Sequence, residues 1–137
     1  LAPPLLCLEA VVHGIGPRGE RALPLREFFV APGRSALAAD EILTRIDVPV
    51  CAGRGVYLKF APRNAMDLAV VGVACFAAGG DRRVALGAVA PTPIRVPPSP
   101  EEAAMFARPI DDVRASAEYR RALVPILVRR ALERVGA

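Results

Sequence analysis

A stretch of three expected strands within residues 53–93 constrains the fold of this chain more than any other part of the sequence. Residues 56–60, 70–78 and 82–89 are short apolar runs separated by polar or glycine-containing corners. The Gly-Gly-Asp sequence at residues 79–81 is typical of a tight hairpin between the second and third runs. The pattern predicts an antiparallel sheet.

The first of these strands carries Lys59, which is the only lysine of the chain: 18 basic residues less this one leave 17 arginines. An unpaired ammonium group buried among apolar side chains would cost roughly several kcal/mol. The Lys59 side chain is therefore expected either to extend along its apolar stem to the surface or to meet an anion or acceptor. The residues alone leave both alternatives open.

Short elements are expected on the N-terminal side of this sheet. They are a short helix at residues 1–8, a hairpin with strands at 9–15 and 20–23, a helical turn at 24–29, a loop at 30–40 and a strand at 41–48. Pro49 ends the last strand, because proline cannot donate to a strand ladder. The loop at residues 50–55 is the best candidate for a boundary between two modules.

Helices are expected on the C-terminal side. Ser99 is positioned to cap a helix at residues 100–106 that has proline at its first position and two glutamates in its first turn. A longer helix is expected at about residues 116–135, and Pro125 inside it predicts a kink or a break. One helical turn is also expected at residues 65–69. The fold class is therefore α+β, an antiparallel sheet with helices packed on one side.

Residues 14–19 match the dinucleotide-binding pattern G-x-G-x-x-G letter for letter. That motif needs a helix beginning at the loop, so that free N–H groups meet the pyrophosphate. Here Pro17 removes one N–H group, and residues 20–24 do not form an amphipathic helix. We interpret the match as a hairpin turn. His13, the only histidine, has no catalytic or metal-binding signature around it and is expected to be structural or exposed.

The net charge of +4 and the pI near 9.5 raise the question of nucleic-acid binding. The arginines are spread along the chain between acidic residues, and no stacking aromatics are interleaved with the basic pairs. We expect a solvated, salt-bridged surface and no nucleic-acid partner. This includes the arginine pairs at residues 82–83, 120–121 and 129–130.

The three cysteines, Cys7, Cys51 and Cys75, are far apart in the sequence and form no C-x-x-C motif. They indicate neither a disulfide framework nor a metal site, and we expect reduced thiols in a cytoplasmic protein. No signal peptide is visible, and no apolar run is long enough to span a bilayer.

Several separate blocks of the chain, in the right order, resemble one known family: the FAD-binding (medium) subunits of molybdenum hydroxylases, the group of aerobic carbon monoxide dehydrogenase and xanthine dehydrogenase. The blocks are residues 24–35, 40–43, 57–63, 67–74, 86–93 and 108–121. The resemblance implies an oxidoreductase subunit that passes electrons from [2Fe–2S] clusters through FAD to an external acceptor. It also implies two partners, an iron–sulfur subunit and a molybdopterin subunit, the latter determining which substrate is hydroxylated.

The resemblance divides the chain into two parts. Residues 1–50 resemble the tail of the FAD-binding domain, and residues 54–137 resemble the C-terminal domain of the carbon monoxide dehydrogenase flavoprotein. The glycine-rich loops that hold the diphosphate of FAD in the family are expected upstream of Leu1. The chain is therefore expected to be a fragment that is inactive and does not bind FAD tightly on its own.

Three cofactor-binding residues follow from the same resemblance. Leu43 is expected to pack near the isoalloxazine ring with Ile42 beside it, and Lys59 is expected to lie near the flavin as well. A cation near the ring favours added negative charge and raises the reduction potential. No residue is expected to be a general acid, general base or metal ligand, because the flavin carries the redox chemistry.

The chain departs from the family pattern at two places. Residues 95–107 are shorter than in family members, so one helix is expected to be missing, and Pro125 interrupts the final helix. A rival interpretation from another functional class is a non-catalytic interaction module that docks a protein or nucleic acid through a basic surface.

Overall fold

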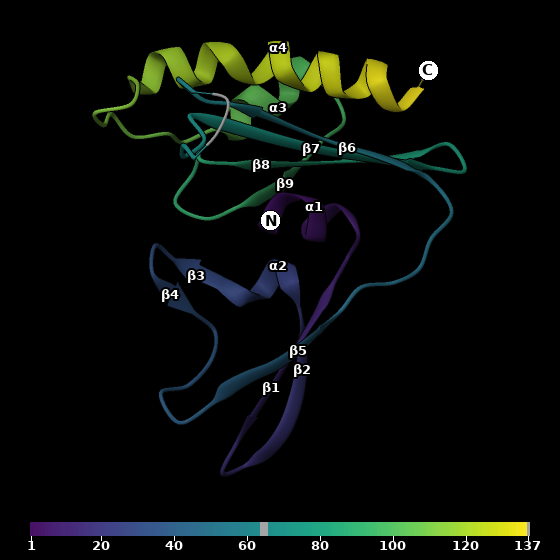
Figure 1. The fold of residues 1–137 in the computed structure, drawn as a ribbon, viewed down its shortest axis with the longest axis vertical. Helices are drawn as coiled ribbons and strands as arrows, with labels where there is room; N and C mark the ends of the chain where they lie inside the picture. Colours follow the sequence, from purple (N-terminus) through teal and green to yellow (C-terminus); the bar gives the residue numbers. More distant parts are fainter. Residues whose placement is uncertain (64–65, 137) are drawn as a thin grey trace.

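The computed structural model describes residues 1–63 and 66–136 of the chain. Figure 1 shows the four-stranded sheet above the three-stranded sheet, with the longest helix covering the outer face of the upper sheet. The upper sheet is built from the C-terminal part of the chain, and the lower sheet from residues before 50. This architecture is the predicted α+β class.

The N-terminal part contains the elements that the sequence predicted, with one addition. In chain order they are α1 (Ala2–Cys7), β1 (Val11–Gly16), β2 (Gly19–Pro24), α2 (Leu25–Phe28), β3 (Phe29–Ala31), β4 (Arg34–Ser35) and β5 (Ile42–Asp47). Strands β2, β1 and β5 form an antiparallel sheet in that order. The expected loop at residues 30–40 was only partly right, because β3 and β4 form a small hairpin there.

The C-terminal sheet has four antiparallel strands in the order β6-β7-β8-β9. They are β6 (Arg54–Phe60), β7 (Val71–Ala78), β8 (Asp81–Gly87) and β9 (Ile94–Val96). The sequence predicted three of them and missed β9. Because β9 is a three-residue edge strand, the prolines around it are tolerated.

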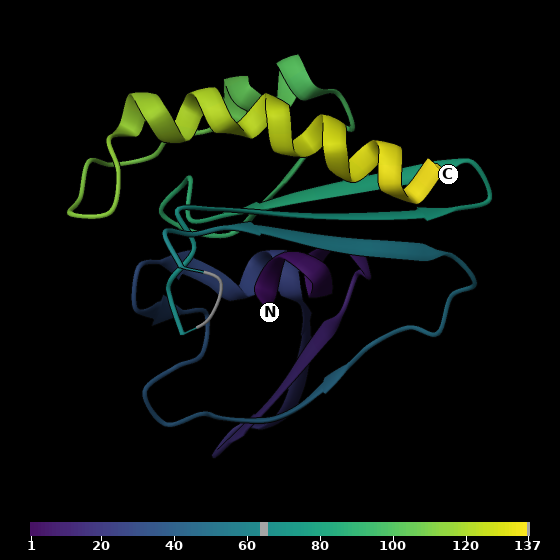
Figure 2. The same ribbon diagram turned by 45° about the horizontal axis from the view of Figure 1, so that its top comes forward.

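Strand β7 is buried on both faces, which explains its nearly continuous apolar sequence. Val71, Val73 and Cys75 belong to the core under the C-terminal helices, whereas Ala74 and Phe76 belong to a second core with α1. Figure 2 shows α1 on the face of the sheet opposite the long C-terminal helix. Helix α1 therefore joins the N-terminal part to the C-terminal sheet.

Two helices cover the other face. Helix α3 (Pro100–Phe106) is capped as predicted, with the Ser99 hydroxyl accepting the Glu102 amide. Helix α4 (Ala117–Gly136) continues through Pro125, so of the predicted kink or break, the break is not found. Buried Val124 and Leu127 flank the proline and hold both halves of the helix on the sheet. The helical turn expected at residues 65–69 is absent at 66–69, and Ala65 lies outside the described residues.

Arg120 is only 2% exposed, which corrects its expected place on the solvated surface. Its guanidinium group donates to the carbonyls of Val70 (3.2 Å) and Ala88 (2.9 Å) and to the carboxylate of Asp112. These acceptors lie before β7, after β8 and before α4. One side chain thus ties together three segments that are distant in the sequence.

Replacing Arg120 with leucine is expected to lower the free energy of unfolding by about 2–4 kcal/mol, because buried carbonyls and a carboxylate lose their donor. The matched control is Arg121→Leu, at the exposed neighbouring position, which is expected to change it by less than about 0.5 kcal/mol. Denaturant unfolding followed by circular dichroism measures both. Equal losses for the two variants would contradict the assigned role of Arg120.

Candidate functional site

Ile42 and Leu43 open strand β5, and both are exposed to solvent, by 71% and 36% of their surface. Ile42 pairs with Ile15 and Leu43 with Gly14 of β1. Because β5 is an edge strand, the two side chains stand at the border of the small sheet. An apolar edge that is left open in this way is a candidate contact surface for a ligand or another part of a protein.

Glu41 holds the start of β5 in place, and no feature of the neighbouring sequence predicted this. Its carboxylate accepts two hydrogen bonds from Arg21 of β2 (2.8 and 2.7 Å) and one from the Ala38 amide (2.7 Å). The Glu41 side chain is 6% exposed, although the residue sits in a surface loop. These bonds, the one from Arg21 above all, lower the pKa of Glu41 from 4.5 to about 2.

Close packing against this loop also explains the glycines of the G-x-G-x-x-G match. A Cβ atom on Gly14 would lie 2.8 Å from the Leu37 side chain, and one on Gly16 would lie 2.8 Å from Glu41. Gly19 has a φ of +100°, as the hairpin turn requires. The prediction of a hairpin turn in place of a dinucleotide loop is confirmed.

Lys59 lies near the end of β6, and its ammonium group is exposed. It donates to the carbonyl of Asp67 at 3.1 Å. The Asp67 carboxylate instead meets Arg63 at 3.5 Å and the Leu68 amide at 2.9 Å. Lys59 forms no ion pair with the described residues, so its charge is not neutralised by the protein around it.

The two halves of the predicted site belong to different sheets, and no strand pairing or hydrogen bond joins Lys59 to β5 among the residues described. Figures 1 and 2 both show the beginning of β5 and the loop after β6 at the same side of the molecule. The beginning of β5, with its exposed apolar residues, and the end of β6, which carries Lys59, therefore lie on one side of the molecule but in separate sheets.

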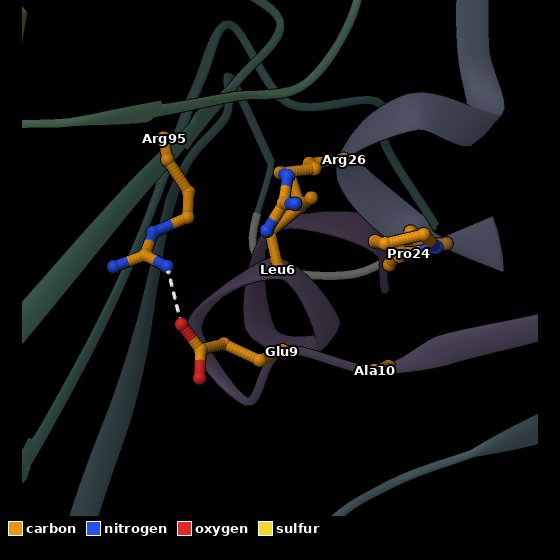
Figure 3. Close-up of a pocket in the computed structure, with 7 residues that line it drawn as sticks. Leu6, Glu9, Ala10, Pro24, Arg26 and Arg95 are labelled. Atoms are coloured by element: carbon orange, nitrogen blue, oxygen red, sulfur yellow. Dashed lines mark hydrogen bonds and ion pairs between the residues drawn. The ribbon is translucent and has the colours of Figure 1, made fainter.

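The cavity drawn in Figure 3 is not a ligand site of this kind. Its volume is about 40 Å³, far below the roughly 300–1,000 Å³ of pockets that hold drug-sized ligands. At its edge Glu9 meets Arg95 at 2.9 Å and Arg83 at 3.3 Å, so the N-terminal segment is held to β8 and β9 by ion pairs. The cavity marks where these parts pack together.

Within the described residues there is no group of three or more histidine, cysteine or acidic side chains that could hold a metal ion. The imidazole of His13 lies 2.7 Å from Asp47 and 3.4 Å from Glu20, within a network of charges between strands β1, β2 and β5. Among the residues that the structure describes, no helix is both long and apolar enough to cross a membrane. All three cysteines are free, as expected.

Comparison with known proteins identifies the kind of protein to which this geometry belongs. Residues 1–51 match the family described as the FAD binding domain in molybdopterin dehydrogenase. The nicotine 6-hydroxylase medium subunit of Paenarthrobacter nicotinovorans is 34% identical over 97% of this chain and 54% of its own length. The xanthine dehydrogenase FAD-binding subunit of Escherichia coli O157:H7 is 37% identical over 69% of this chain and 35% of its own length.

The solved carbon monoxide dehydrogenase from Hydrogenophaga pseudoflava superposes with a TM-score of 0.91 at 26% identity, over 98% of this chain and 55% of that chain. This chain is a homologue of the medium, FAD-binding subunits of molybdenum hydroxylases. The family resemblance stated from the sequence is confirmed, and so is the fold class.

Nearly all of this chain aligns with these two relatives, but it spans only about half of their length. The alignment with the nicotine 6-hydroxylase subunit covers 154 positions, more than the 137 residues of this chain. The relative therefore has residues, within the aligned region, that have no counterpart in this chain.

The depressed pKa of Glu41 predicts a pH dependence of stability. A carboxyl whose folded pKa lies below its unfolded pKa stabilises the fold above about pH 4.5, and this contribution is lost as the pH falls towards 2. The difference in unfolding free energy between the wild type and Glu41→Gln should be constant above pH 5 and shrink towards pH 2. A difference that is the same at pH 3 and pH 7 would contradict the stabilising role of the ionised Glu41 carboxylate.

Proposed function

We propose that this chain is part of the flavoprotein subunit of a molybdenum hydroxylase and helps to pass electrons from [2Fe–2S] clusters through FAD to an external acceptor. The structural likeness of nearly all of this chain to about half of a carbon monoxide dehydrogenase chain carries the proposal, together with the sequence likeness to the medium chain of that enzyme. We propose that residues 1–50 are the tail of the FAD-binding domain and that residues 54–137 form the C-terminal domain.

In this proposal Ile42, Leu43 and Lys59 face the isoalloxazine ring. FAD supplies the redox chemistry when it is bound. Ile42 and Leu43 provide exposed apolar contact on an edge strand, and Glu41 fixes that strand in position. The Lys59 ammonium, unpaired with any carboxylate of the described residues, provides positive charge beside the ring.

The diphosphate of FAD would be held by residues other than those described here. The G-x-G-x-x-G match forms a hairpin whose first two glycines, Gly14 and Gly16, pack against residues 37–41, so it is not a strand-to-helix loop. We further propose an iron–sulfur subunit and a molybdopterin subunit as partners, by analogy with the medium subunits of the relatives. A cytoplasmic location is supported by the three free cysteines.

The rival interpretation, a docking module with a basic surface, is not favoured. Arginines from every part of the chain form ion pairs with carboxylates, so the excess of positive charge is not gathered into one stripe. Binding to nucleic acid favours such a stripe or patch.

The decisive variant is Lys59→Met in the flavin-loaded subunit that contains this chain. Removing the charge is expected to lower the flavin reduction potential by about 20–40 mV, equivalent to a loss of about 1–2 kcal/mol for a two-electron couple. Lys59→Arg should keep most of the potential, because it keeps the charge. Spectroelectrochemical titration measures the three proteins side by side.

Arg130→Gln is the matched control, since it removes the same positive charge from an exposed position of helix α4, away from Lys59 in the sequence and outside its hydrogen-bonded surroundings. It should leave the potential nearly unchanged. A Lys59→Met protein with the wild-type potential, or an Arg130→Gln protein with the same shift, would refute the assigned role of Lys59.

A further inference from the structure

We propose that a cavity lined by Arg108, Arg114 and Arg120 binds a small divalent oxyanion of the phosphate class. The cavity has a volume of about 220 Å³, and its other walls are apolar and include Pro32, Pro91 and Pro109. It lies where the β3–β4 turn meets the loop after β8 and the loop before α4 (Figure 1). We call it the arginine cavity.

The charges around the arginine cavity do not balance. Among the described residues, Arg114 and Arg120 share a single carboxylate, that of Asp112, while Arg108 donates only to neutral carbonyls, among them that of Ala107 at 3.0 Å. The neighbouring Asp111 bonds the Ala117 amide at the start of α4 and does not line the cavity. Three guanidinium groups therefore face one carboxylate, which leaves an excess of two positive charges.

The hydrogen bonds of Arg120 are incomplete as well. Its terminal nitrogens are satisfied by Val70, Ala88 and Asp112, but its buried Nε–H has no acceptor among the described residues. A buried donor without an acceptor is uncommon in folded proteins and calls for a partner. The group is also held rigidly at one wall of the cavity, so little entropy would be lost when an anion binds.

Size and charge together indicate the class of ligand. At 220 Å³ the cavity is smaller than the roughly 300–1,000 Å³ pockets that hold drug-sized molecules. A phosphate group carries about −1.5 to −2 charges near pH 7 and presents several acceptor oxygens, which match planar guanidinium donors. The proline walls leave one polar side, which favours a compact anion over an extended strand of nucleic acid.

The test is a calorimetric titration of the full 137-residue chain with inorganic phosphate, at constant ionic strength maintained with sodium chloride. Saturable binding with a Kd of about 1 mM or tighter is expected. The double variant Arg108→Gln/Arg114→Gln should bind at least about tenfold more weakly, because charge-assisted hydrogen bonds are lost. Arg120 is left intact because the fold depends on it.

The control is Arg129→Gln/Arg130→Gln, which removes the same net charge from exposed positions of α4. It should bind phosphate as the wild type does. Amide chemical shifts of the wild type provide a readout that needs no variant, and phosphate should move the signals of residues 88–90, 108 and 110–114. The proposal is overturned by absent saturation, by equal weakening in both double variants, or by shifts confined to other residues.

Discussion

Burial of β7 on both faces is the constraint on which the rest of the structure depends. Its side chains alternate between a core under α3 and α4 and a second core that contains α1. The second core is what attaches the N-terminal part of the chain to the C-terminal sheet. Without it, the edge strand β5 and the Lys59 strand would have no fixed relation, since no ladder joins their sheets.

Charged groups then fix the details that apolar burial leaves free. Arg120 joins the loop before α4 to the end of the upper sheet where β7 begins and β8 ends, and its side chain is almost fully buried. Glu41 does the corresponding work in the lower sheet, where Arg21 and the Ala38 amide hold its carboxylate. Lys59 differs from both, because its one bond goes to a carbonyl and leaves its charge available. This contrast separates the residues that stabilise the fold from the one proposed to act on a cofactor.

Turn and capping residues in the sequence predicted the elements whose ends they determine. The Gly-Gly-Asp corner predicted the β7–β8 hairpin, and Ser99 with Pro100 predicted the beginning of α3. Features decided by distant partners were missed or misjudged. Strand β9 exists because β8 offers it an edge, and α4 passes through Pro125 because the residues on both sides are buried on the sheet.

The surroundings of individual charged side chains were also not predictable from neighbouring residues. Arg120 stands beside another arginine in a polar stretch, so only the fold reveals that it is buried. Glu41 likewise gives no local sign, because its partners lie in other segments of the chain. The sequence left two alternatives for Lys59, a side chain that extends to the surface or one that meets an acceptor. In the structure its ammonium group is exposed and also donates to a carbonyl oxygen. Its assignment to the flavin came from family resemblance and stays a proposal.

The most direct test of the central claim is an experimental structure of the flavin-loaded subunit that contains this chain. The account predicts the isoalloxazine ring in van der Waals contact with Leu43, with Ile42 beside it and the Lys59 ammonium near the ring. A ring bound elsewhere, with Leu43 and Lys59 both open to solvent, would contradict the proposed site while leaving the fold and the family intact.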